Sequence, residues 1–285
     1  MATISYSTPL VPRQLRIELT SFCNAHCHPC HRHLMLRKPS HMDWNLVEKV
    51  VNEASQLPER LQEIVLSDFG ETMLYPAWER ATQLVARKLP FTRLVLPTNG
   101  TLLTDEVVEK LARLPTLKLV NLSINAYLPE TYTAFHKLPA SNLKVIEAAA
   151  VRLRKLRPDI ILWLSMVRAA EYQSEKEVEL FREHWSKFGQ VQINQANYAG
   201  VPGREPLTPV NLPCRSLFSD LVVLAEGQCL SCCFVAEPLP ELVVGDASRE
   251  SLMEIWHSRG FGEIRQLHLT GRRAELEICR SCTFA

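Results

Sequence analysis

Cysteine is the residue type whose number and spacing point most directly to chemistry. The 285-residue chain contains nine cysteines, which form two groups with none between Cys30 and Cys214. The first group, Cys23, Cys27 and Cys30, has the spacing C-x3-C-x2-C. The second group occupies the C-terminal part of the chain: Cys214, Cys229, Cys232, Cys233, Cys279 and Cys282. An odd count without an export signal at residues 1–16 does not fit a disulfide framework, so the groups indicate metal sites in a reducing compartment.

The first group has the right number of thiolates for an iron–sulfur cluster with one open corner. Three thiolates bind three irons of a [4Fe–4S] cube, and the fourth iron is left without a protein ligand. S-adenosylmethionine (SAM) can chelate that iron through its amino and carboxylate groups. One-electron reduction then yields a 5′-deoxyadenosyl radical that takes hydrogen from an unactivated carbon. A structural zinc site is the alternative, with a fourth ligand from the histidines of this stretch: His26, His28, His31 and His33.

Alternating strand-like and helix-like segments are expected to position the first group. Six nearly continuous apolar runs are typical of parallel strands covered on both faces: 15–19, 63–66, 93–96, 117–124, 160–167 and 191–194. The stretches between them have helical spacing, as in Val178, Phe181 and Trp185 behind a predicted capping box at 174–177. Such units form a parallel sheet with right-handed crossovers. We therefore expect an α/β fold, a partial (β/α)6 TIM-like barrel with its active site at the C-terminal strand ends.

A stretch at 200–213 that carries proline and glycine is predicted to be a linker. It divides the chain into a core domain at 1–200 and a small α+β domain at 201–285, which has few core elements and several cysteines and is expected to need a staple. Composition is that of an ordinary globular protein, with 46% hydrophobic residues, 22% charged residues and a net charge of +1. No basic surface and no membrane-spanning run is indicated. We expect a cytoplasmic protein that binds neither nucleic acid nor membranes.

With C-x3-C-x2-C on the first strand-to-helix loop, the sequence resembles the radical SAM superfamily. The segment 68–71 (Asp-Phe-Gly-Glu) is similar to the family's Gly-Gly-Glu loop, which contacts the SAM amino group, with Phe69 in place of the first glycine. The resemblance implies that residues at four successive strand ends bind SAM: Gly70, Glu71, Thr98, Asn99, Ser123, Asn125 and Arg168. Each alone is also readable as a turn or capping residue. Relatives have an aromatic residue before the third cysteine, and Pro29 takes its place here, so the adenine contact must come from elsewhere.

The second group resembles the SPASM/twitch extension of radical SAM enzymes. The match includes the hairpin segment 221–233, the helix at 251–258 and the terminal C-x2-C at 279–282. It implies that one auxiliary [4Fe–4S] cluster is ligated by four cysteines: Cys214, Cys232, Cys279 and Cys282. A zinc ribbon is the alternative, although its first pair would have the spacing C-x2-C.

Two residues near this module have open roles. Cys229 is either a small buried hydrophobe or a thiol that donates a hydrogen atom to a carbon radical, a role for which Cys233 is the second choice. Tyr198 is a candidate for a substrate contact. The first hypothesis is a two-electron oxidation of a sugar or aminocyclitol-like molecule, with a flavodoxin- or ferredoxin-type electron donor. The others are epimerisation of a sugar or peptide with a cysteine donor, and a non-catalytic zinc-binding protein.

Overall fold

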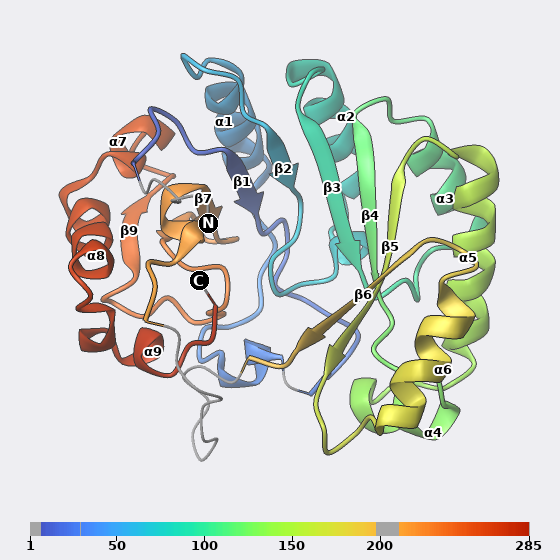
Figure 1. Cartoon of the computed structure of the whole chain (residues 1–285). Coiled ribbons are helices and arrows are strands. Elements are labelled where there is room, and N and C mark those ends of the chain that lie inside the picture. Colours follow the sequence, from blue (N-terminus) through green and yellow to red (C-terminus); the bar gives the residue numbers. More distant parts are fainter. Residues whose placement is uncertain (1–6, 29, 198–210, 285) are drawn as a thin grey trace.

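The computed structural model describes residues 7–28, 30–197 and 211–284, and these residues build one curved sheet of nine strands (Figure 1). Its first six strands are parallel to their neighbours in the order of the sequence. They are β1 (Gln14–Ile17), β2 (Glu63–Val65), β3 (Arg93–Thr98), β4 (Leu117–Ser123), β5 (Ile161–Arg168) and β6 (Gln190–Gln195). The expected α/β fold with a partial barrel of six strands is confirmed.

The C-terminal strands extend this sheet instead of forming one of their own. Strand β7 (Asp220–Val223) pairs in parallel with β1, and β8 (Gln228–Leu230) and β9 (Val243–Asp246) follow it in antiparallel pairing. In Figure 1 these strands continue the sheet beyond the edge of β1. The sequence did not indicate this pairing. The proposed division at residue 200 falls within 198–210, outside the described residues.

Six helices cover the outer face of the parallel strands. They are α1 (Trp44–Ser55), α2 (Trp78–Lys88), α3 (Asp105–Ala112), α4 (Pro129–His136), α5 (Asn142–Leu156) and α6 (Glu175–Trp185). Three further helices, α7 (Leu252–Trp256), α8 (Arg259–Leu269) and α9 (Glu277–Arg280), accompany β7–β9. None of the helices in the described part of the chain is long and apolar enough to cross a membrane.

The predicted capping box before α6 is only half formed. The Ser174 hydroxyl accepts a hydrogen bond from the Glu177 backbone N–H at 3.2 Å, as expected of an N-cap. The Glu177 carboxylate does not return to Ser174, because it accepts hydrogen bonds from Tyr127 N, Leu128 N and the Thr131 hydroxyl. The buried Glu177 carboxylate thus provides hydrogen-bond acceptors for the backbone N–H groups of Tyr127 and Leu128, which precede α4.

Apolar side chains pack on both faces of the sheet, but unequally. Leu15, Ile17 and Ile64 belong to the large core between the sheet and the helices. The inner face carries a small cluster of Val65, Val95 and Leu119, packed against Ile161 and Trp163. The inner face, the side of the sheet opposite the helices, is therefore less completely filled with apolar side chains than the outer one.

Candidate active site

The first cysteine group lies on the loop that follows β1, as predicted, and all three thiols are half-buried and free of disulfide bonds. Hydrogen bonds fold the loop: Cys30 N donates to Cys27 O at 3.0 Å. Burial, with a smaller contribution from the neighbouring Cys23, raises the pKa of the Cys30 thiol to about 11. Burial also raises the pKa of Cys27 well above its usual value, and Cys30 and Cys23 add to that shift. The protons of the three thiols must leave before they bind a metal.

Backbone hydrogen bonds connect helix α4 to the cysteine loop. His26 N and His28 N donate to the carbonyls of His136 and Phe135, each at 3.0 Å. The His136 ring is fully buried, with Nδ1 3.0 Å from Cys27 Sγ and Nε2 2.8 Å from the Ile124 carbonyl oxygen. Burial lowers the pKa of His136 to about 4. The sequence analysis missed this residue, because a histidine at the end of a helix carries no signal of a partner so distant in the chain.

The loop after β2 approaches the cysteine loop closely. A Cβ on Gly70 would lie 1.8 Å from the Thr20 carbonyl oxygen, so only glycine fits there. Glu71 N donates to Phe22 O at 2.8 Å, and its carboxylate accepts from the Thr98 hydroxyl and from Asn99 N, both at 2.8 Å. These contacts join the C-terminal ends of β1, β2 and β3 in one network.

The ends of β4 and β5 carry the other predicted SAM-contacting residues. Asn125 has a left-handed backbone, with φ of 59°, and its side-chain oxygen accepts from Val167 N at 2.7 Å. Gln173, which the sequence analysis did not select, donates to the Asn125 carbonyl at 2.7 Å. Ser123 ends β4 on the same rim. The Arg168 guanidinium is paired with Glu175 at 2.5 Å, so its charge is already partnered.

The four predicted ligands of the second group come together. They line one pocket, although they belong to three separate segments: Cys214, Cys232, Cys279 and Cys282. Backbone N–H groups of Phe234 and Phe284 each point at a cysteine sulfur at 3.4 Å. The Arg273 guanidinium donates to the carbonyls of Leu212 and Phe284 and so ties the C-terminus to the start of the module. Four thiolates with N–H donors around them fit a fully ligated iron–sulfur cluster.

The spread of the cysteines bears on the zinc alternative. In the described part of the chain, no three side chains of His, Cys, Asp or Glu converge closely enough to hold a single metal ion.

The two remaining cysteines lie on opposite faces of the sheet. Cys229 is fully buried in the large outer core, and its Sγ is 3.6 Å from the Gly227 carbonyl oxygen. Burial raises the pKa of Cys229 to about 12. Cys233 packs on the inner face against Val222 and Leu224, 3.7 Å from the Ser216 hydroxyl. Burial in the outer core is a suitable environment for a small hydrophobe, and both roles considered for Cys229 stay predictions. Tyr198 and Pro29 lie outside the described residues.

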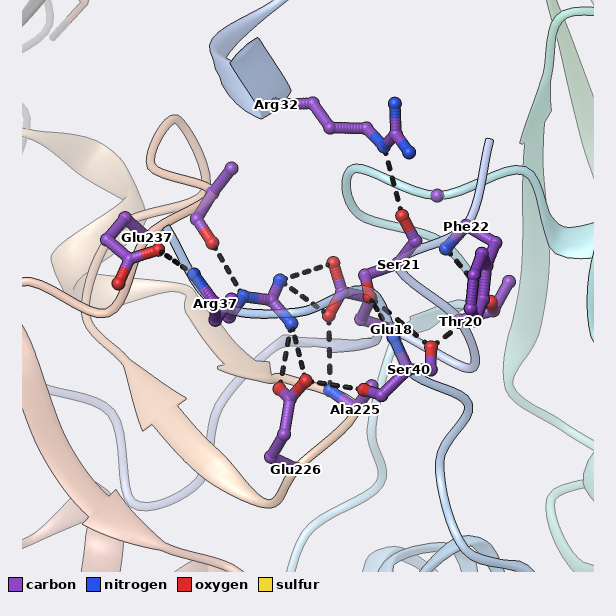
Figure 2. Close-up of polar contacts among 12 residues, drawn as sticks. Glu18, Thr20, Ser21, Phe22, Arg32, Arg37, Ser40, Ala225, Glu226 and Glu237 are labelled. Atoms are coloured by element: carbon purple, nitrogen blue, oxygen red, sulfur yellow. Dashed lines mark hydrogen bonds and ion pairs between the residues drawn. The ribbon is translucent and has the colours of Figure 1, made fainter. Parts of the chain in front are cut away.

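Arg37 joins the loop after the first cysteine group to the C-terminal module (Figure 2). Its guanidinium pairs with Glu18, which follows β1, at 2.8 Å, and with Glu226, in the turn between β7 and β8, at 2.7 Å. Arg37 Nε donates to the Ala236 carbonyl at 2.9 Å, and Arg37 N donates to the Glu237 carboxylate at 3.0 Å. Burial raises the pKa of Glu18, and Arg37 opposes that shift. In the sequence, the one sign of this contact is Glu18, an acidic residue within the predicted apolar run 15–19.

Comparisons with known proteins agree with this geometry. Residues 17–167 match the Radical SAM superfamily, and residues 214–283 match an iron-sulfur cluster-binding domain of the SPASM type. The chain belongs to the radical SAM superfamily and is a radical SAM enzyme with a SPASM domain. These two domains imply SAM, a SAM-binding [4Fe–4S] cluster and auxiliary iron–sulfur binding.

Individual relatives cover the chain to different extents. A tungsten-containing aldehyde ferredoxin oxidoreductase cofactor-modifying protein from Pyrococcus furiosus is 35% identical over 102 residues, which is 36% of this chain and only 28% of that protein. An S-adenosyl-L-methionine-dependent 2-deoxy-scyllo-inosamine dehydrogenase from Niallia circulans is 20% identical over 94% of this chain and 91% of its own length. Among solved structures, BtrN in complex with AdoMet and 2-DOIA has a TM-score of 0.61 at 17% identity, with 95% of this chain and 93% of that chain covered. That likeness shows the shared fold.

Proposed function

We propose that this enzyme oxidises a small polar substrate, a sugar or aminocyclitol-like molecule, by two electrons. The observation that carries the proposal is the pocket of four cysteines in the C-terminal module. Four protein thiolates leave no open coordination position for a substrate, so a cluster there suits electron transfer and not substrate binding. The full-length similarity to a 2-deoxy-scyllo-inosamine dehydrogenase supports the same class of reaction.

The residues around the first cysteine group have separable roles in this proposal. When bound, SAM and the clusters supply a 5′-deoxyadenosyl radical for hydrogen abstraction and an acceptor for the second electron. Cys23, Cys27 and Cys30 hold the first cluster, and the strand-end residues bind SAM: Gly70, Glu71, Thr98, Asn99, Ser123, Asn125 and Arg168. To contact SAM, the Arg168 guanidinium must first release the Glu175 carboxylate.

The C-terminal module and its surroundings supply the remaining groups. One auxiliary [4Fe–4S] cluster is ligated by four residues: Cys214, Cys232, Cys279 and Cys282. Tyr198 is retained as a candidate substrate contact. The domains are proposed to extend over 1–200 and 201–285. A flavodoxin- or ferredoxin-type protein is proposed as the electron donor.

The test is a product analysis with anaerobically reconstituted, reduced enzyme. 2-Deoxy-scyllo-inosamine and related cyclitols are supplied with SAM, and 5′-deoxyadenosine and ketone are quantified. We expect one 5′-deoxyadenosine for each ketone formed. Formation of 5′-deoxyadenosine together with an inverted alcohol in place of a ketone would contradict oxidation.

Epimerisation of a sugar or peptide is the second candidate, and the position of Cys233 on the inner face favours it. In this reaction the Cys233 S–H bond breaks, a C–H bond forms on the opposite face of the substrate carbon, and the external electron donor supplies one electron while water supplies one proton to restore the thiol. In deuterated water, an epimerase places deuterium at that carbon, and Cys233→Ala abolishes the deuterium but not 5′-deoxyadenosine formation. An enzyme that oxidises its substrate places no deuterium at that carbon, and Cys233→Ala leaves its product unchanged.

A further inference from the structure

One buried histidine in the C-terminal module has a ring nitrogen without a hydrogen-bond partner. His268 lies in the last turn of α8, on the face that also buries Phe261, Ile264 and Arg265. This spacing is that of the buried stripe of an amphipathic helix. His268 is only 2% exposed, and its Nε2 has no partner among the described residues. Because an unpaired buried polar atom costs free energy, Nε2 is expected to have a partner in the loaded enzyme.

The other ring nitrogen of His268 determines where the ring carries its proton. The Cys214 backbone N–H donates to His268 Nδ1 at 3.2 Å. A backbone N–H can only donate, so Nδ1 is an acceptor and the ring proton is on Nε2. His268 Nε2–H is therefore a hydrogen-bond donor, and the backbone of a predicted cluster ligand fixes the orientation of its ring.

His268 lines the same pocket as the four predicted ligands of the auxiliary cluster. The described residues that line this pocket include no carboxylate, and much of its wall is apolar, with Leu217, Leu242 and Ile264 among the lining residues. The Ser231 hydroxyl, also at the pocket, donates to the Leu242 carbonyl at 3.3 Å. The side-chain acceptors that this pocket offers to Nε2–H are therefore sulfur atoms.

A second buried donor lines the same pocket. Arg273 is 3% exposed, and its two terminal nitrogens donate to the carbonyls of Leu212, Cys282 and Phe284. Its Nε is buried without a partner in the described part of the chain. Because a guanidinium stays charged, Arg273 adds a positive charge at a pocket of four cysteines.

We propose that His268 Nε2–H donates a hydrogen bond to a sulfur of the auxiliary cluster and, with the charge of Arg273, raises the reduction potential of that cluster. Hydrogen bonds to the sulfurs and a nearby cation stabilise the reduced form, which carries one more negative charge. The apolar walls strengthen both effects, because the local dielectric is low. A cluster with a raised potential is the better acceptor for the second electron of the proposed oxidation. The inference deepens that proposed function and rests on it.

The test is a redox titration of full-length enzyme with both clusters, followed by EPR of the reduced clusters. His268→Phe keeps most of the ring's volume and removes the donor. We expect it to lower the equilibrium constant for one-electron reduction of the auxiliary cluster about tenfold, a shift of about 59 mV to more negative potential. Arg273→Met should shift the potential in the same direction. His268→Gln, whose amide can both accept from Cys214 N and donate into the pocket, should restore most of the wild-type potential.

Arg265→Lys is the matched control on the same helix. Arg265 is 5% exposed on the buried face of α8, but it is not among the residues that line the pocket. Its guanidinium donates to the carbonyls of Leu217 and Trp256, both at 2.8 Å. Lysine keeps the charge and loses part of this bonding, so we expect lower thermal stability with less than about a twofold change in the reduction constant.

Pulsed EPR of the reduced enzyme with nitrogen-15-labelled histidine detects the hydrogen bond itself. We expect a weak nitrogen coupling to the auxiliary cluster, which His268→Phe removes. A strong coupling, as from a nitrogen bound directly to iron, would make His268 a ligand and would overturn the proposal.

Two results of the titration would also overturn it. They are an unchanged potential in His268→Phe, or a shift of equal size in His268→Phe and Arg265→Lys. Iron is counted on the same samples. If the wild-type enzyme holds no auxiliary cluster, the proposed function fails; if the cluster is present and its potential does not respond to His268→Phe, the inferred hydrogen bond fails alone.

Discussion

The thiol of Cys27 and the imidazole of His136 lie in contact, with Sγ 3.0 Å from Nδ1, although 109 residues separate them in the chain. The other ring nitrogen, Nε2, lies 2.8 Å from the Ile124 carbonyl oxygen at the end of β4. One buried ring thus links the cysteine loop, helix α4 and a strand end. The cysteine loop is held in place by tertiary contacts as well as by its own turns.

Replacing His136 by alanine should therefore loosen the cysteine loop. The variant loses a fully buried ring and its hydrogen bonds, so we expect the free energy of unfolding to fall by about 2–4 kcal/mol. Chemical denaturation measures this fall. We also expect less iron per chain after reconstitution. A variant of wild-type stability and iron content would show that the contact is incidental.

Gly70 and Gly260 form a matched pair for testing the close approach of the second loop. Gly70→Ala must displace the Thr20 carbonyl, and we expect a loss of about 3 kcal/mol of stability together with loss of SAM binding. Gly260→Ala in helix α8 meets nothing within 4 Å, and we expect it to gain about 0.5–1 kcal/mol. Thermal unfolding and dialysis against labelled SAM check both. Equal behaviour of the two variants would refute the steric argument.

Arg37 and Glu18 are suited to a double-mutant cycle. Arg37→Met leaves Glu18, whose side chain is 0% exposed, buried without its cation, so we expect a loss of about 3 kcal/mol in the free energy of unfolding. The double variant Arg37→Met/Glu18→Gln should recover part of that loss, because the uncompensated charge is gone. Urea unfolding measures all four corners. Additive effects would mean that the two residues do not stabilise each other.

The free energy of unfolding is expected to depend more on the polarity of the side chain at position 229 than on the presence of a thiol. Cys229→Ala removes one buried atom and is expected to cost about 1 kcal/mol. Cys229→Ser buries a hydroxyl in the apolar core and is expected to cost about 1–3 kcal/mol more. Calorimetric unfolding distinguishes the two. Loss of product with intact 5′-deoxyadenosine formation in Cys229→Ala would instead revive this residue as the hydrogen-atom donor.

Local sequence patterns predicted much of the fold. The apolar runs located β1 to β6, because apolar side chains on one face of each strand belong to the large core or pack against it. The spacing of the cysteines and the residues at the strand ends indicated where the site lies. Those features depend on the few residues next to each strand, so the sequence carries them directly.

Contacts between distant segments were not predictable in this way. The position of Glu177 fits a capping box, but its carboxylate accepts hydrogen bonds from the backbone at the start of α4 instead. The face on which Cys229 lies depends on how β8 pairs with β7 and on the pairing of β7 with β1, which no local pattern sets. His136 and Arg37 act through partners 109 and about 190 positions away, so their roles emerge only from the fold.

The central claim, that the two cysteine groups hold two separate [4Fe–4S] clusters, is tested most directly by counting iron. Anaerobically reconstituted wild-type enzyme should contain about eight irons and eight sulfides per chain, since each cube has four of each. The variant Cys23→Ala/Cys27→Ala/Cys30→Ala should retain about four and form no 5′-deoxyadenosine from SAM. Zinc in place of iron in the wild-type enzyme, or full iron and 5′-deoxyadenosine formation in the variant, would contradict the account.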